Sequence, residues 1–95
     1  MEIDRSSLIV SKAGRDKGQL FFVIDADEQY VYLADGKSRK LEKPKRKKRK
    51  HVRKVLRSET RVAVKLLSGD KVLNGELRRD LASLSRSMQG KNLGG

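Results

Sequence analysis

The N-terminal part of the chain alternates short apolar runs with polar segments. The apolar runs are Leu8–Val10, Leu20–Ile24 and Tyr30–Ala34, and they are rich in β-branched and aromatic residues. This composition is typical of strands, and each run is too short for a helix of ordinary length. The pattern therefore predicts three strands joined by polar turns.

Glycines mark the turns of this region. Gly14 and Gly18 lie between the first two runs, and Asp35-Gly36 follows the third. Because glycine adopts the positive φ of tight turns, we assign turn roles to all three glycines and expect a hairpin into a fourth strand at Arg39–Leu41. Four or five short antiparallel strands would leave exposed edges in an open sheet. This favours closure into a small barrel of the SH3-like class, giving a mainly β fold.

The C-terminal part of the chain shows helical spacing. Val62–Leu67 fits either a last strand or a short helix, and we favour the helix. Farther on, apolar residues recur at intervals of four, three and four, on one predicted helical face: Leu77, Leu81, Leu84 and Met88. Asn74 is the expected N-cap of this helix, and residues 90–95 are expected to form a disordered tail.

Positive charge is concentrated in one segment. The 95 residues carry a net charge of +12, and residues 37–57 contain 13 Lys or Arg with a single acid, Glu42. The rest of the chain is therefore neutral in sum. A chain of this length forms one domain with a modest core, and charge focused on one part of it indicates a polyanionic partner. Nucleic acid is the leading candidate.

The centre of this segment is expected to be a loop. Pro44 favours extended backbone at Lys43, and like charges within Lys45–Lys50 repel one another. We interpret this stretch as an extended, solvated basic loop whose side chains contact phosphates.

Several function classes are excluded by missing chemistry. The chain has no cysteine, which rules out disulfides, thiolate nucleophiles and the usual structural zinc sites. The single histidine, His51, cannot form a typical metal site alone, and the acidic residues at 25–28 have no histidine or cysteine near them in sequence. We therefore expect no enzyme activity, no cofactor and no metal.

No apolar run approaches the roughly 18 residues of a membrane span, and the N-terminus lacks an apolar signal region, so we expect a soluble, cytoplasmic protein.

The order of these features resembles a known family. The segment Leu8–Ile24, with apolar residues around Gly18, resembles the KOW motif of ribosomal proteins and transcription elongation factors. With Tyr30–Leu33, the basic run, His51 and a late helix, residues 6–86 are similar to the fourteen-e type of large-subunit ribosomal protein. The resemblance implies an SH3-like barrel that binds ribosomal RNA. The basic run is denser than the resemblance implies, so we favour a bacterial KOW-domain relative that is either ribosomal or ribosome-associated.

On this interpretation, residues 1–60 form the barrel with its basic loop at 37–57, and residues 61–89 form the C-terminal helical segment. The expected RNA contacts are cations of the Gly14–Gly18 loop and of the basic loop, with one aromatic ring for base stacking: Arg15, Lys17, Lys37, Arg39, Lys40, Lys43, Lys45, Arg46, Lys47, Lys48, Arg49, Lys50, Arg53, Lys54 and Tyr32. The expected partners are RNA, above all ribosomal RNA, and neighbouring ribosomal proteins. We expect a monomer when the protein is free, and no membrane contact.

Two alternatives remain open. The protein could be an interaction module of the transcription or translation machinery that docks through the apolar helix face at 77–88, although packing of that face on the barrel is the simpler use. DNA binding ranks lower, because no helix-turn-helix or basic-zipper pattern accompanies the charge. Binding that weakens strongly with salt would favour RNA over a protein partner.

Overall fold

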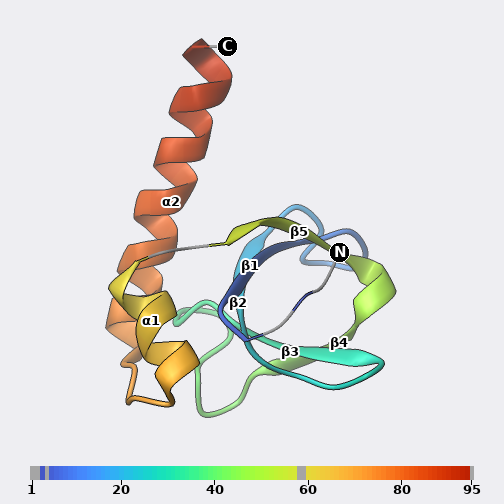
Figure 1. The fold of residues 1–95 in the computed structure, drawn as a ribbon. Helices are drawn as coiled ribbons and strands as arrows, with labels where there is room; N and C mark the ends of the chain where they lie inside the picture. Colours follow the sequence, from blue (N-terminus) through green and yellow to red (C-terminus); the bar gives the residue numbers. More distant parts are fainter. Residues whose placement is uncertain (1–2, 4, 58–59, 95) are drawn as a thin grey trace.

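The computed structural model describes residues 3, 5–57 and 60–94, and it shows a small, mainly β domain in which five antiparallel strands form a curled half-barrel beside two α-helices (Figure 1). The elements in chain order are β1 (Ser7–Ser11), β2 (Leu20–Ala26), β3 (Tyr30–Ala34), β4 (Lys45–Lys48), the 3-10 helix η1 (Arg49–His51), β5 (Val52–Arg57), α1 (Arg61–Ser68) and α2 (Asn74–Gly94). The strands are ordered β4-β3-β2-β1-β5 in the sheet. The three strands predicted from the apolar runs are confirmed as β1, β2 and β3.

The curl of the sheet follows from breaks in its register. The pairing of β1 with β5 shifts between Leu8 and Ile9, and the pairing of β2 with β3 shifts between Val23 and Asp25. Such irregularities bend a strand and increase its twist. The two ends of the sheet therefore approach each other.

The sheet buries apolar side chains on both faces. Consecutive residues of a strand point to opposite faces, so Phe21 and Phe22 enter different clusters, and both are fully buried. The inner cluster fills the half-barrel with Ile3, Ile9, Phe21, Val23, Val31, Leu33 and Val52. The outer cluster joins the sheet to the helices through Leu8, Phe22, Ala34, Val62, Ala63, Leu66, Leu77 and Leu81. This double burial fixes the register of the central strands.

The prediction of a solvated loop at Lys45–Lys50 is wrong. The first four residues of this segment form strand β4, and the rest belongs to η1. The 3-10 helix η1 connects β4 to β5 and is bonded to the rest of the sheet: the Arg49 N–H donates to the Gln29 carbonyl before β3 (2.9 Å), and the His51 carbonyl accepts from the Lys12 N–H after β1 (2.8 Å). The strand expected at Arg39–Leu41 is also wrong, because these residues form turns in the connection between β3 and β4.

The ambiguity at Val62–Leu67 is resolved in favour of the helix, since these residues lie in α1. The Thr60 side chain accepts a hydrogen bond from the Ala63 N–H, and Gly69 ends the helix in the left-handed conformation with φ 77°, which is the usual αL termination. In α2, Leu77 and Leu81 are buried and Leu84 packs against the same outer cluster, as their spacing predicts. The Met88 side chain lies outside the described part of the structure.

The start of α2 differs from the prediction of an Asn74 cap. The Leu77 N–H donates to the Leu73 carbonyl, and the Glu76 carboxylate accepts from the Leu73 N–H at 3.1 Å, so Leu73 takes the N-cap place and Glu76 closes half of a capping box. The Asn74 side chain instead bonds another part of the chain. Its Oδ1 accepts from the Leu41 N–H (2.8 Å), and its Nδ2 donates to the Glu42 carboxylate. Asn74 therefore ties the β3–β4 connection to α2.

The far end of α2 extends beyond the sheet (Figure 1). The helix continues to Gly94, although the sequence predicts a disordered tail from residue 90. Gly95 lies outside the described residues.

Candidate nucleic-acid interface

Strand β4 carries four consecutive basic residues that point alternately to two sides. Lys47 pairs with the buried Val31, whereas Lys48 pairs with the half-exposed Tyr30. Directly opposed residues of an antiparallel pair share a face. Lys45 and Lys47 therefore face inward, whereas Arg46 and Lys48 face outward.

The inward lysines meet one carboxylate. The Lys47 ammonium lies 2.5 Å from Asp16 Oδ1, 2.6 Å from Ser11 Oγ and 2.7 Å from the Ala13 carbonyl. These three acceptors use all the protons of the ammonium. The Lys45 Nζ lies 2.9 Å from Asp16 Oδ2, and Ser11 Oγ also donates to Asp16 Oδ1 at 2.7 Å. Both ammonium groups therefore bond within the protein, which makes Lys45 and Lys47 weaker candidates for phosphate contact than their exposed neighbours.

Asp16 stays ionised in this cluster. Burial disfavours its charge and raises its pKa, but hydrogen bonds from Lys47, Ser11 and Lys45 outweigh burial and hold the pKa well below its ordinary value. Asp16 lies in the turn between Gly14 and Gly18, whose φ angles are 85° and 88°. The hydrogen bonds and ion pairs of this cluster therefore attach the Gly14–Gly18 loop to β4.

Arg49 is also used internally. Its Nε donates to the Asp27 carbonyl (2.7 Å), and its Nη1 donates to the Ile3 carbonyl (2.8 Å). Two of its five donors thus hold the N-terminal segment and the β2–β3 turn. We call Lys45, Lys47 and Arg49 the bonded set.

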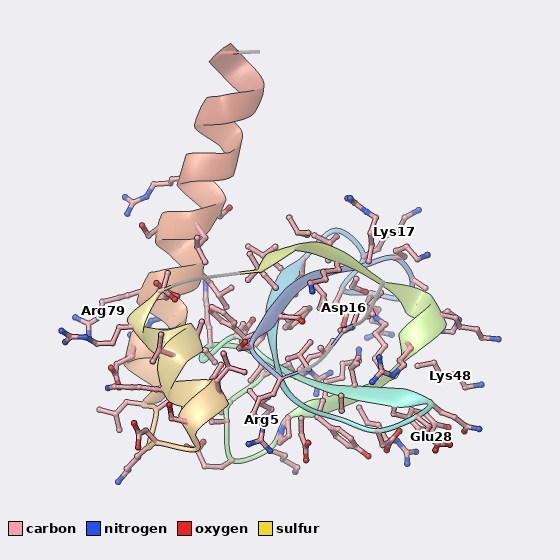
Figure 2. All side chains as sticks on the ribbon, viewed as in Figure 1. Arg5, Asp16, Lys17, Glu28, Lys48 and Arg79 are labelled. Atoms are coloured by element: carbon pink, nitrogen blue, oxygen red, sulfur yellow. The ribbon has the colours of Figure 1, made fainter. Side chains whose placement is uncertain are left out.

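The alternate residues of the same run are exposed. Arg46, Lys48 and Lys50 are all solvent-exposed, and among the described acidic side chains none forms an ion pair with them. The Arg46 guanidinium carbon lies 4.5 Å from the centroid of the Tyr30 ring, which is cation–π distance. Figure 2 shows the Lys48 side chain pointing away from the sheet. We call Arg46, Lys48 and Lys50 the exposed set.

The Gly14–Gly18 loop adds cations beside this strand. Arg15 and Lys17 are exposed, and Lys17 points outward in Figure 2. Arg15 lines a shallow hollow together with Arg39 and Lys45. Gly14 lines a second hollow with Arg46 and Lys48. The structure thus brings the predicted loop and the predicted basic run to adjoining surfaces.

Other predicted cations lie elsewhere. Lys40 and Lys43 flank the two residues that are bonded to Asn74, so they lie beside the start of α2, and Lys37 is exposed in the same connection. Arg53 and Lys54 on β5 line a third hollow with Lys50. Lys12, which is not among the contacts expected from the sequence, lines that hollow too.

Tyr32 is a poor stacking candidate in its present surroundings. Its hydroxyl donates to Asp27 Oδ2 at 3.2 Å. Asp27 is held as an anion, because the backbone N–H groups of Tyr30 and Gln29 donate to its carboxylate and lower its pKa. A phosphate approaching Tyr32 would meet this fixed negative charge. Tyr30, which is not among the contacts expected from the sequence, has the Arg46 guanidinium over its ring instead.

Comparison of the sequence with protein-family models gave no match, and a search of curated proteins gave none either.

In the described ranges, no group of three or more His, Asp or Glu side chains could hold a metal ion. No helix in those ranges is long and apolar enough to cross a bilayer.

Proposed function

We propose that this protein binds RNA through the exposed set on β4 and η1 together with the cations of the Gly14–Gly18 loop. The observation that carries the proposal is the group of outward cations Arg46, Lys48 and Lys50, which is not neutralised by ion pairs within the described residues. Arg46 and Lys48 share a hollow with Gly14, at the start of the loop that carries Arg15 and Lys17. Such a group of cations can displace counterions from several phosphates at once. The side chains of Lys47, Lys45 and Arg49 bond within the protein and so hold this surface in place.

The nature of the scaffold favours RNA over other polyanions. We propose that the curled half-barrel is of the SH3-like class and that its first loop is a KOW loop, as the sequence of Leu8–Ile24 suggests. The KOW resemblance then points to ribosomal RNA and to a ribosomal or ribosome-associated role in the cytoplasm. Beside the basic strand, the described residues form no α-helix that could enter a DNA groove, and this disfavours the helix-in-groove mode of sequence reading in DNA.

A second candidate function is contact with a protein of the transcription or translation machinery. The helix face that could have served this purpose is occupied, because Leu77 is 0% exposed and Leu81 is 7% exposed. Three other apolar side chains favour the candidate instead: Val64 (54% exposed), Leu67 (48%) and Leu73 (56%). They lie on α1 and just before α2, away from the exposed set.

The test is the salt dependence of binding to a labelled, unstructured oligouridylate. If about five phosphates are contacted, the slope of log K against log salt is near −3.5. Lys48→Gln should flatten this slope by about 0.7. The matched control, Lys71→Gln, removes the same charge from an exposed position before α2 and should leave the slope unchanged. A wild-type slope near zero would refute the proposal and leave the protein-contact candidate.

A further inference from the structure

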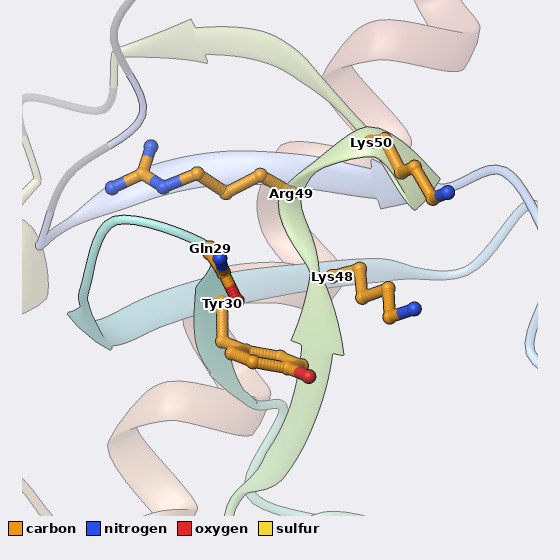
Figure 3. Close-up of a pocket in the computed structure, with 5 residues that line it drawn as sticks. All are labelled: Gln29, Tyr30, Lys48, Arg49 and Lys50. Carbon is orange, nitrogen blue, oxygen red and sulfur yellow. The ribbon is translucent and has the colours of Figure 1, made fainter.

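A hollow on the outer face of the β3–β4 pair has the components of a nucleotide site. It is lined by Gln29, Tyr30, Lys48, Arg49 and Lys50, and its volume is about 400 Å³ (Figure 3). This is within the size range of small-ligand sites, roughly 300 to 1,000 Å³. The hollow combines an aromatic ring, an amide side chain and cations.

The Tyr30 ring separates this hollow from its neighbour. Tyr30 and Lys48 line both hollows, whereas Arg46 lines only the second and Gln29 lines only the first. Arg46 therefore covers one face of the ring, and the other face is turned to the first hollow. In Figure 3, Gln29 and Arg49 lie on the same side of the Tyr30 ring. A planar group entering the hollow can stack on the ring while the guanidinium supports the ring from behind.

Some polar groups of the hollow are bonded within the protein, and others are exposed and available to a ligand. Arg49 forms part of the wall, since its side chain is bonded to the Asp27 and Ile3 carbonyls. Gln29 is anchored by its backbone, whose N–H donates to Asp27 Oδ1 and whose carbonyl accepts from the Arg49 N–H. The Gln29 side chain is exposed, and its amide both donates and accepts hydrogen bonds. This suits the edge of a nucleobase.

The charges at the rim suit a phosphate. Lys48 and Lys50 are exposed and border the hollow, and in Figure 3 both point away from Arg49. Asp27, which holds the Tyr32 hydroxyl, disfavours a phosphate at the other ring of the strand. A nucleotide is therefore oriented with its phosphate toward the lysines and its base on Tyr30.

We propose that this hollow receives one unpaired nucleotide of the bound RNA, with its base stacked on Tyr30, its base edge at the Gln29 amide and its phosphate between Lys48 and Lys50. The proposal rests on the RNA binding proposed above and adds a preference for single-stranded over paired segments. A base within a duplex is covered on both faces by its neighbours, so only an unstacked base can lie on the ring.

The experiment compares three probes with the full chain: oligouridylate, an abasic ribose-phosphate chain of the same length, and the oligouridylate–oligoadenylate duplex. Tyr30→Leu removes the ring, and Tyr30→Phe keeps it. Tyr30→Leu should weaken oligouridylate binding roughly 5- to 150-fold, with no change for the abasic chain and no change in salt slope. Tyr30→Phe should bind like the wild type.

The possible outcomes distinguish failure of the nucleotide site from failure of the proposed RNA binding. Wild-type affinity of Tyr30→Leu for oligouridylate, or equal wild-type affinities for the base-bearing and abasic chains, would overturn the nucleotide site while a steep salt slope still upheld RNA binding. A wild-type protein that binds none of the probes would overturn both. Should Tyr30→Leu fail to fold, Gln29→Ala takes its place, because that side chain is exposed. It should weaken oligouridylate binding several-fold and leave the abasic chain unaffected, and an unchanged affinity for oligouridylate would overturn the site.

Discussion

Two triple variants of one basic run should have opposite effects. Replacing the bonded set (Lys45, Lys47 and Arg49) by Gln should destabilise the fold, whereas replacing the exposed set (Arg46, Lys48 and Lys50) by Gln should weaken RNA binding with little effect on stability. Both variants remove three positive charges from the same six residues, so each is the control for the other. A solvated loop would give no such difference.

The expected change in the free energy of unfolding depends on the surroundings of each set. The side chains of Lys47 and Asp16 are 8% and 11% exposed, and removing one partner of a buried ion pair costs about 3 to 5 kcal/mol. Loss of the two Arg49 bonds to backbone carbonyls adds at least about 1 kcal/mol. The total is a large part of the roughly 5 to 15 kcal/mol that keeps a domain folded. In the exposed set, the main structural loss is the Arg46–Tyr30 contact, about 0.5 to 1 kcal/mol at a surface site.

Urea denaturation followed by circular dichroism measures the first effect, and fluorescence anisotropy with labelled oligouridylate measures the second. The exposed-set variant should flatten the salt slope by about 2, from three cations at about 0.7 each. A bonded-set variant as stable as the wild type would refute the role of the Asp16 cluster in holding β4. An exposed-set variant with the wild-type salt slope would show that RNA contacts lie elsewhere.

Three further changes test individual contacts. Gly36→Ala should lower the free energy of unfolding by about 3 kcal/mol, because alanine disfavours the positive φ and its Cβ would collide with the Asn74 backbone carbonyl. The control is Gly18→Ala, which has a similar φ but no heavy atom within 4 Å of the added Cβ. In the same urea denaturation assay it should lower the free energy of unfolding by only about 1 to 2 kcal/mol. Asp16→Asn should lower the free energy of unfolding at neutral pH. Because hydrogen bonds outweigh burial and lower the folded pKa of Asp16 below the usual 3.8, the difference from the wild type should stay constant above about pH 5 and become smaller as the pH falls below about 4; a difference as large at pH 2 as at pH 7 would contradict this account. Asn74→Ala should lower the free energy of unfolding by about 1 kcal/mol, because the Leu41 N–H loses its acceptor; an unchanged midpoint would show that water replaces it.

The apolar parts of the fold were predictable from the sequence. Strand β3 has the predicted bounds, and β1 and β2 extend the predicted runs by one or two residues. Leu77 and Leu81 are buried as their spacing predicts. In these segments, burial depends on side chains whose pattern is visible locally.

Strand β4 could not be predicted in this way. Alternation between an inward and an outward face is invisible when every residue is basic, so Lys45–Lys48 has the appearance of a solvated run. The acid that makes the inward positions possible is Asp16, 31 residues before Lys47. Only the fold brings the two together.

The candidate site was predictable as a region but not residue by residue. The Gly14–Gly18 loop and the basic run do lie on adjoining surfaces. Three predicted contacts, Lys45, Lys47 and Arg49, are instead bonded within the protein. The choice between Tyr30 and Tyr32 depends on Asp27, whose position in the turn cannot be deduced from strand alternation alone.

The charged strand β4 also bears on self-association. In the sheet order, β4 and β5 are the two edge strands, and the open edge of a sheet is a template on which another copy can add a strand. Lysine at an edge discourages such pairing, because two basic strands repel each other. Exposed cations on both edges, Arg46 and Lys48 on β4 and Arg53 on β5, thus protect the half-barrel from fibril-like growth while they remain available to a polyanion.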